Sequence, residues 1–136
     1  MAHATSRKET HAHHGAIYQA YQMLHIVFIL LPIAMGLDKF FNIIVNWNQY
    51  FPPFLMNSMG ENSQIFWTVV GIIEVIIGMG VWFKPKVFAY IFALMQIGII
   101  INLITFGVFY EIVLTDTALL IASLALGRLS SVYDRT

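Results

Sequence analysis

Cysteine is absent from this chain of 136 residues, and charged side chains are scarce. Without cysteine the chain has no thiol redox centre, no iron–sulfur cluster on its own thiolates and no cysteine-attached haem. Only 10% of the residues are charged, whereas 59% are hydrophobic, and this composition is too apolar for a soluble domain with a polar face. We therefore predict a protein that is embedded in a lipid bilayer.

Other functional signals are also missing from the sequence. The net charge is zero at pH 7, so electrostatics give no indication of a nucleic-acid partner or an acidic substrate, and we predict no nucleic-acid binding. The chain has no phosphate-binding loop, no catalytic triad motif and no paired metal-ligand motif, and we assign no metal site. Only one histidine lies in an apolar stretch, which excludes a haem held by two histidines inside a single bundle.

Three apolar stretches are long enough to cross a bilayer: roughly residues 17–37, 65–83 and 87–127. The last is about twice the ~20 residues that one span needs. It breaks at the sequence ITFGVFYE, where Gly107 and Glu111 indicate a short turn at the membrane surface. We therefore predict an all-α membrane protein with four transmembrane helices, at about 17–37, 65–83, 87–107 and 109–127.

The basic residues around these expected helices are unevenly distributed. Lys39 alone follows the first helix, and the others lie on the opposite side of the membrane: Arg7, Lys8, Lys84, Lys86, Arg128 and Arg135. Because cytoplasmic segments carry the excess of Lys and Arg, we predict that both termini are cytoplasmic, as an even number of spans requires. Short connections favour an antiparallel up-down-up-down bundle as one domain over residues 17–128, followed by a C-terminal tail at 129–136.

Two further segments lie outside the expected helices. Residues 1–16 contain four histidines, at positions 3, 11, 13 and 14, and we predict a disordered tail that binds metal weakly, because nothing fixes the geometry of these side chains. Residues 42–60 form the first connection, which is rich in aromatic side chains: Trp47, Tyr50, Phe51 and Phe54. Such a loop is typical of the outer membrane interface, where it serves as an anchor, a lid over the bundle or a contact for a partner.

Glu74 interrupts the apolar run WTVVGIIEVIIGMGVW at residues 67–82. Counting ~1.5 Å per residue from Ile65 places this carboxyl group roughly 13 Å deep, near the middle of a ~30 Å hydrocarbon core. A charged group there is strongly disfavoured, so Glu74 should be protonated, paired or turned toward the bundle interior. Gly71 and Gly78 share its helical face and would let another helix approach closely, and we predict an inward-facing Glu74.

Four more polar side chains are candidates for the same buried ligand or proton site: Gln96, His25, Lys39 and Asp116. Gln96 ranks first as a partner of Glu74, because both lie near the midplane. His25 falls in the inner half of the first helix, and Lys39 at its outer end is expected to fold back onto Asp116 in the outer third of the fourth helix. Ionisable groups inside a membrane are functional candidates by default, although these could equally serve to fix helix register.

The sequences GLDKF at 36–40, GIIEVIIGMG at 71–80 and LGRLSS at 126–131 resemble those of the DoxX-like family of small four-helix integral membrane proteins. The pattern of that family is G-x-x-K after the first span, G-x-x-E-x-x-x-G in the second and G-R-x-S near the C-terminus. The resemblance runs over most of the chain and places eight residues at family positions: Gly36, Lys39, Gly71, Glu74, Gly78, Gly127, Arg128 and Ser130. His25 stands where members often carry arginine, and the third helix has Gln96 and Asn102 where a histidine is common.

The resemblance implies a membrane subunit of the bacterial cytoplasmic (inner) membrane. Some relatives are linked to sulfur-compound oxidation with quinone as the electron acceptor, and others accompany oxidative-stress systems. Because this chain has no intrinsic redox cofactor, a redox role requires a bound quinone, or a lipid-like ligand, near Glu74. We expect partner subunits or self-association in the lipid bilayer rather than an enzyme acting alone. A purely structural subunit and, more remotely, a small proton-coupled carrier stay open as alternatives.

Overall fold

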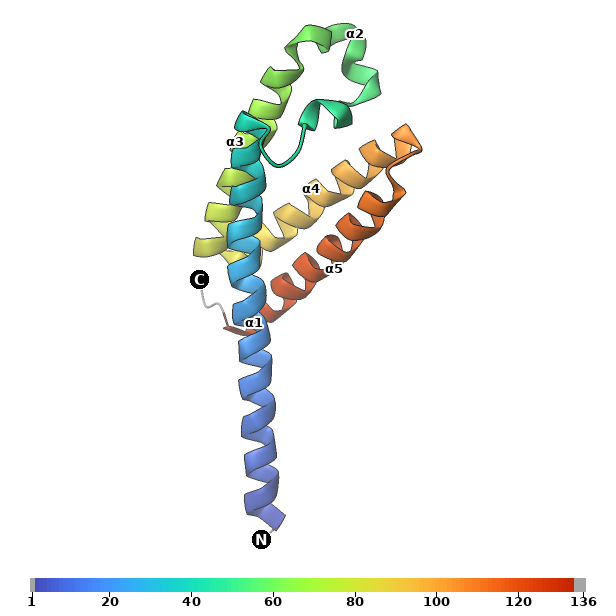
Figure 1. The fold of residues 1–136 in the computed structure, drawn as a ribbon. Coiled ribbons are helices and arrows are strands. Elements are labelled where there is room, and N and C mark those ends of the chain that lie inside the picture. Colours follow the sequence, from blue (N-terminus) through green and yellow to red (C-terminus); the bar gives the residue numbers. More distant parts are fainter. Residues whose placement is uncertain (1, 134–136) are drawn as a thin grey trace.

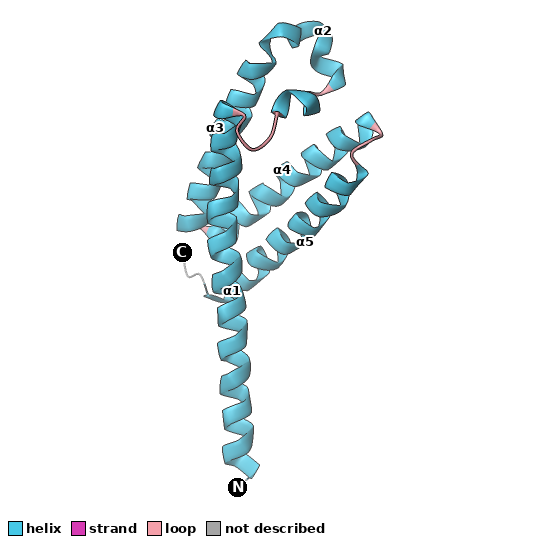
Figure 2. Cartoon of the chain, viewed as in Figure 1, coloured by secondary structure: helices cyan, strands magenta, loops and turns pink. Residues whose placement is uncertain are grey.

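The structure is a computed structural model that describes the backbone of residues 2–133 and the side chains of residues 15–59 and 61–133. Within this range every regular element is a helix (Figure 2). The long helices are α1 (Ala2–Phe41), α3 (Ser63–Phe83), α4 (Pro85–Phe106) and α5 (Tyr110–Tyr133). Short elements fill the first connection: η1 (Trp47–Tyr50), η2 (Pro53–Leu55), α2 (Met56–Met59) and η3 (Gly60–Asn62).

Within the described part of the chain, four segments are long and apolar enough to cross a membrane: Gly15–Phe41 of α1 and the whole of α3, α4 and α5. Large apolar side chains lie exposed along all of them, among them Leu30, Ile76, Leu94 and Leu114. Such surfaces suit contact with a lipid bilayer. The predicted all-α architecture with four spans is therefore confirmed, whereas the side of the membrane on which each terminus lies stays a prediction.

The helix ends follow local chemistry. Lys84 leaves the helical conformation just before Pro85, which opens α4 because its ring fits the first helical position and it has no N–H to satisfy. Gly107 ends α4 in the left-handed region at φ 74°, and its N–H donates to the carbonyl oxygen of Ile104.

Two helices are longer than the sequence analysis predicts. α1 begins at Ala2, within the segment expected as a disordered tail over residues 1–16, and α5 continues to Tyr133, past the expected end at residue 127. Neither extension contains proline, and α1 continues through Gly15, which weakens a helix without ending it. The side chains of the four tail histidines lie outside the described side chains, as do residues 134–136 of the expected C-terminal tail.

The bundle consists of two helix pairs. α1 packs along α3 and α4 packs along α5, and the two pairs diverge from the Lys84 end of the molecule toward the first connection (Figure 1). Where they converge, buried side chains from all four helices form the apolar core: Tyr21, Phe28, Ile77, Val81, Ala89, Phe92 and Leu126. Where they diverge, the packed core gives way to a cavity.

The contact between α1 and α3 depends on facing glycines. A methyl group built on Gly36 would lie 2.7 Å from the carbonyl oxygen of Gly71, and one built on Gly71 would lie 2.6 Å from the carbonyl oxygen of Gly36. A methyl group on Gly78 would lie 2.8 Å from the carbonyl oxygen of Ile29. The two backbones therefore touch directly, which brings the side chains beside these glycines close together as well.

Candidate functional site

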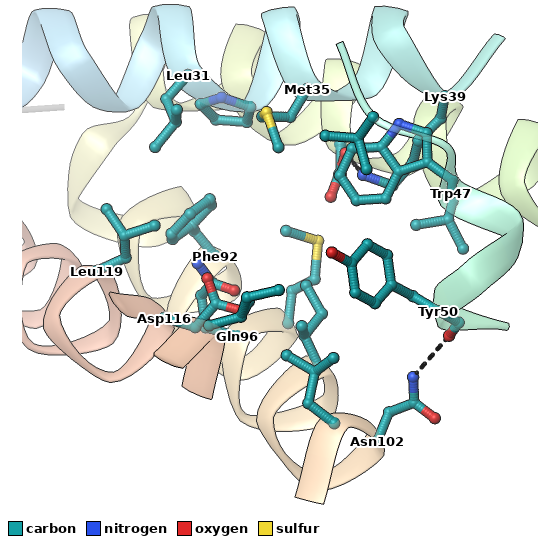
Figure 3. Close-up of a pocket in the computed structure, with 18 of the residues that line it drawn as sticks. Leu31, Met35, Lys39, Trp47, Tyr50, Phe92, Gln96, Asn102, Asp116 and Leu119 are labelled. Atoms are coloured by element: carbon teal, nitrogen blue, oxygen red, sulfur yellow. Dashed lines mark hydrogen bonds and ion pairs between the residues drawn. The ribbon is translucent and has the colours of Figure 1, made fainter. Parts of the chain in front are cut away.

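A cavity of about 240 Å³ lies between the two helix pairs, next to the first connection. All four long helices and the connection contribute to its walls (Figure 3). Much of the lining is apolar, including Leu31 and Met35 of α1, Phe92 and Ile99 of α4, and Leu119 of α5. Against these surfaces stand a small number of polar groups, which is the usual composition of a site for a small, largely apolar ligand.

An ion pair between α1 and α3 forms one polar wall. Nζ of Lys39 lies 2.7 Å from Oε2 of Glu74, and the two side chains are only 3% and 4% exposed. The ammonium group of Lys39 also lies 3.6 Å from the centroid of the Trp47 ring, within range of a cation–π interaction. Each buried charge is thus balanced within the protein, and both side chains still line the cavity.

Asp38 positions the tryptophan that covers this ion pair. Its carboxylate accepts hydrogen bonds from the backbone N–H groups of residues 43, 44 and 45 and from Nε1 of Trp47, at 2.8–3.1 Å. These bonds satisfy N–H groups of the chain as it leaves α1, and Asn42 makes the reversal in the left-handed region at φ 51°. The two adjacent residues therefore have different roles: Asp38 holds the loop in its conformation, and the side chain of Lys39 lines the cavity.

The opposite wall carries Gln96 on α4 and Asp116 on α5, which face Lys39 across the cavity (Figure 3). Gln96 is 4% exposed, and its Oε1 has no hydrogen-bond partner among the described residues. The sequence predicts that Lys39 pairs with Asp116 and that Glu74 pairs with Gln96. The structure shows neither of these two pairs. Lys39 bonds Glu74 instead, because the Gly36–Gly71 contact brings α1 against α3 at the depth of both residues.

Near the first connection, three more polar side chains line the cavity. Nδ2 of Asn102 donates to the carbonyl oxygen of Tyr50 at 3.1 Å, so this bond ties the first connection to α4 beside the cavity (Figure 3). The Tyr50 ring packs edge-on against Phe109, with centroids 4.8 Å apart. Trp67 of α3 is 7% exposed, and its Nε1, like Oδ1 of Asn102, is buried without a hydrogen-bond partner among the described residues.

His25 lies away from this site. Its Nε2 donates to the carbonyl oxygen of Val81 at 2.7 Å, and its ring stacks on Tyr21 with centroids 5.4 Å apart. In a continuous helix the carbonyl of Val81 would accept from the N–H of residue 85, but that residue is proline. His25 therefore supplies a donor that α3 lacks at its end, and of the five candidate residues it is the one that does not line the cavity.

Four residues that line the cavity were not predicted from the sequence as part of the site: Trp47, Tyr50, Trp67 and Asn102. Trp47 and Tyr50 belong to the aromatic loop, for which a lid was one of three interpretations, and both line the cavity. Phe54 of the same loop is 75% exposed, which suits contact with the membrane interface. The available signal for Asn102 is its position six residues after Gln96 on an otherwise apolar helix.

Comparison of the chain with protein-family models, with curated proteins and with solved structures finds no match. The function is therefore inferred from the chemistry of the cavity. Its walls can enclose an apolar ring or chain, its ion pair can provide charged hydrogen-bonding groups, and its unpartnered amide and indole groups can bond a polar ligand group.

Proposed function

We propose that this integral membrane protein holds a small lipid-soluble ligand with polar oxygen atoms, of the quinone class, in the cavity between its two helix pairs. The observation that carries the proposal is the combination of apolar walls with Lys39 and Glu74 on one side and Gln96 and Asp116 on the other. A ligand of this class matches such walls, because it has a flat apolar ring and oxygen atoms that accept hydrogen bonds or exchange protons.

A role as a subunit of a larger redox assembly completes the proposal. The chain has no cysteine and few residues outside its helices, so any electrons that reach a bound quinone come from another protein. The resemblance of GLDKF and GIIEVIIGMG to DoxX-like sequences supports the same role. Lys39 and Glu74, which occupy the family positions in those motifs, are the residues that the structure pairs at the cavity.

A structural role is the second candidate, and one observation favours it. The Lys39–Glu74 pair lies next to the Gly36–Gly71 contact, where a charged hydrogen bond would fix the register of α1 on α3. In that case the cavity would be a by-product of two diverging helix pairs, and the polar groups would serve helix packing alone.

Native mass spectrometry of the protein, extracted gently from its own membrane, tests the proposal. Recovery with a stoichiometric quinone or with redox subunits is the expected result. A lone or self-associated bundle that carries only bulk phospholipid would favour the structural role.

A variant pair separates the two candidates further. Replacing both charged residues, as Lys39→Met with Glu74→Met, removes the ion pair without leaving one charge buried alone. If this double variant folds and no longer retains quinone, the pair serves the ligand. If it folds and retains quinone as the unmodified protein does, the pair serves packing.

A further inference from the structure

Three buried polar atoms at the cavity have no hydrogen-bond partner among the described residues: Oε1 of Gln96, Oδ1 of Asn102 and Nε1 of Trp67. All three side chains line the cavity, and those of Gln96 and Trp67 are more than nine-tenths buried. Buried polar groups in native proteins are nearly always hydrogen-bonded, and each one left without a partner is unfavourable. Their concentration at one cavity indicates that a ligand supplies the missing partners.

The chemical nature of these atoms restricts the ligand. The indole N–H of Trp67 can only donate, so it requires an acceptor. The amide oxygens of Gln96 and Asn102 can only accept, so each requires a donor. Carbonyl or ether oxygens on a ligand can only accept, so they can bond Trp67 but neither amide oxygen. A hydroxyl group can both donate and accept.

The acceptors lie at two depths along the cavity. Gln96 and Asn102 are six residues apart on α4, or roughly 9 Å along the helix axis at ~1.5 Å per residue. Asn102 lies at the loop end, where its Nδ2 bonds Tyr50, and Gln96 lies deeper, on the wall that faces Lys39 (Figure 3). A ligand that satisfies both therefore carries donors at two separated points.

We infer that the cavity selects a lipid-soluble ligand with hydroxyl groups at both ends of a small head, in preference to the same head with carbonyl oxygens. This inference rests on the proposed function and deepens it, because it names the reduced, quinol form of a quinone as the form that is held. A glyceride with free hydroxyl groups presents the same chemistry from the bulk lipid. In both ligands a hydroxyl donates to Gln96, a second donates to Asn102, and one hydroxyl oxygen accepts from Trp67.

Binding of three probes to the full-length protein in detergent micelles tests the inference. The probes are decyl-benzohydroquinone, decyl-benzoquinone and a monoacylglycerol of similar chain length, with oxygen excluded so that the hydroquinone stays reduced. We expect the hydroquinone to bind about tenfold or more tightly than the quinone, because the quinone leaves both amide oxygens without a donor. The dimethyl ether of the hydroquinone keeps the ring and the oxygens but has no O–H, and it should bind as weakly as the quinone.

Two variants connect the selectivity to individual residues. Gln96→Met removes one acceptor at similar volume and should weaken the hydroquinone alone, so that its advantage over the quinone falls severalfold. Trp67→Phe removes the donor that both forms use and should weaken both by a similar factor. Gln22→Met is the matched control, because Gln22 lies exposed on α1 away from the cavity, and it should change neither affinity.

The outcomes distinguish the inference from the proposed function. Equal or tighter binding of the quinone would overturn the selectivity for hydroxyl groups and leave the quinone proposal standing, with Gln96 presenting its amino group to the ligand. Binding of the monoacylglycerol alone would support the hydroxyl chemistry and overturn the quinone as its source. Failure of all the probes to bind would overturn both. If Gln96→Met does not fold, the comparison of hydroquinone, quinone and dimethyl ether on the unmodified protein decides the matter alone.

Discussion

Lys39 on α1 and Glu74 on α3 are joined by a 2.7 Å ion pair that lines the cavity and lies next to the close contact of Gly36 with Gly71 between the two helices. This one interaction therefore connects the packing of the bundle with the polarity of its cavity. Four groups of variants separate the contributions.

The first prediction concerns the ion pair itself. Glu74→Gln leaves the ammonium group of Lys39 buried without its counter-charge, and we expect the free energy of unfolding to fall by about 3 kcal/mol. The double variant Lys39→Met with Glu74→Met should recover most of that loss, since no charge remains buried alone. Unfolding of the single variants Lys39→Met and Glu74→Met and of the double variant in mixed micelles, combined as a double-mutant cycle, measures the coupling. Strictly additive losses would mean that the two side chains do not stabilise each other.

The second prediction concerns the glycine contact. Gly71→Ala places a methyl group 2.6 Å from the carbonyl oxygen of Gly36, where only backbone movement can make room. We expect a loss of about 1–3 kcal/mol and a wider separation of α1 from α3. Gly98→Ala is the matched control, because a methyl group there has no neighbour within 4 Å, and alanine favours a helix by up to ~1 kcal/mol over glycine. Thermal unfolding that is equal for the two variants would argue against direct backbone contact.

A third prediction concerns the loop between α1 and α3 that lines the cavity. Asn102→Leu removes the hydrogen bond to the carbonyl oxygen of Tyr50, and a bond of this kind contributes about 1 kcal/mol. Hydrogen–deuterium exchange over residues 47–51 should therefore rise roughly fivefold. Thr105→Val is the control, since Thr105 is exposed and its hydroxyl bonds only within its own helix. Unchanged exchange in Asn102→Leu would show that the aromatic contacts of Tyr50 hold the loop without Asn102.

The fourth prediction separates His25 from the cavity. His25→Leu leaves the carbonyl of Val81 without a donor, and we expect a loss of about 1–3 kcal/mol in stability. Ligand affinity per folded molecule should stay unchanged, because His25 does not line the cavity. Gln22→Leu, one turn away on an exposed face, should alter neither quantity. A loss of ligand binding in folded His25→Leu would contradict the separation of the two sites.

The number of spans was predictable from the sequence because apolar length is a local property. The breaks between helices were also predictable, since the helix-breaking residues Pro85 and Gly107 stand in the sequence at the two ends of α4. The start of α1 was not, because the polar residues before Gly15 form a helix without an apolar pattern that would mark it. Helix propensity alone is a weak signal of this kind.

The partners of the polar residues were harder to predict. Depth along each helix places Glu74 near Gln96, and Lys39 near Asp116, but depth does not tell which helices are adjacent. The adjacency of α1 and α3 depends on the contact between Gly36 and Gly71. This contact joins two helices, so it cannot be predicted from the sequence of either helix alone. Trp47 reaches Lys39 only because the carboxylate of Asp38 folds the intervening chain, and this is likewise a property of the folded loop.

The Lys39–Glu74 pair also has a consequence for the way the chain enters the membrane. Lys39 emerges from the ribosome 35 residues ahead of Glu74, so α1 alone would bring this ammonium group to the bilayer without its partner in the ion pair. We therefore expect α1 and α3 to become stably inserted together, as a helical hairpin that neutralises itself, with α4 and α5 following as a second step. Nascent chains truncated before Glu74 should accordingly stay extractable by alkali, and those that extend past Phe83 should not.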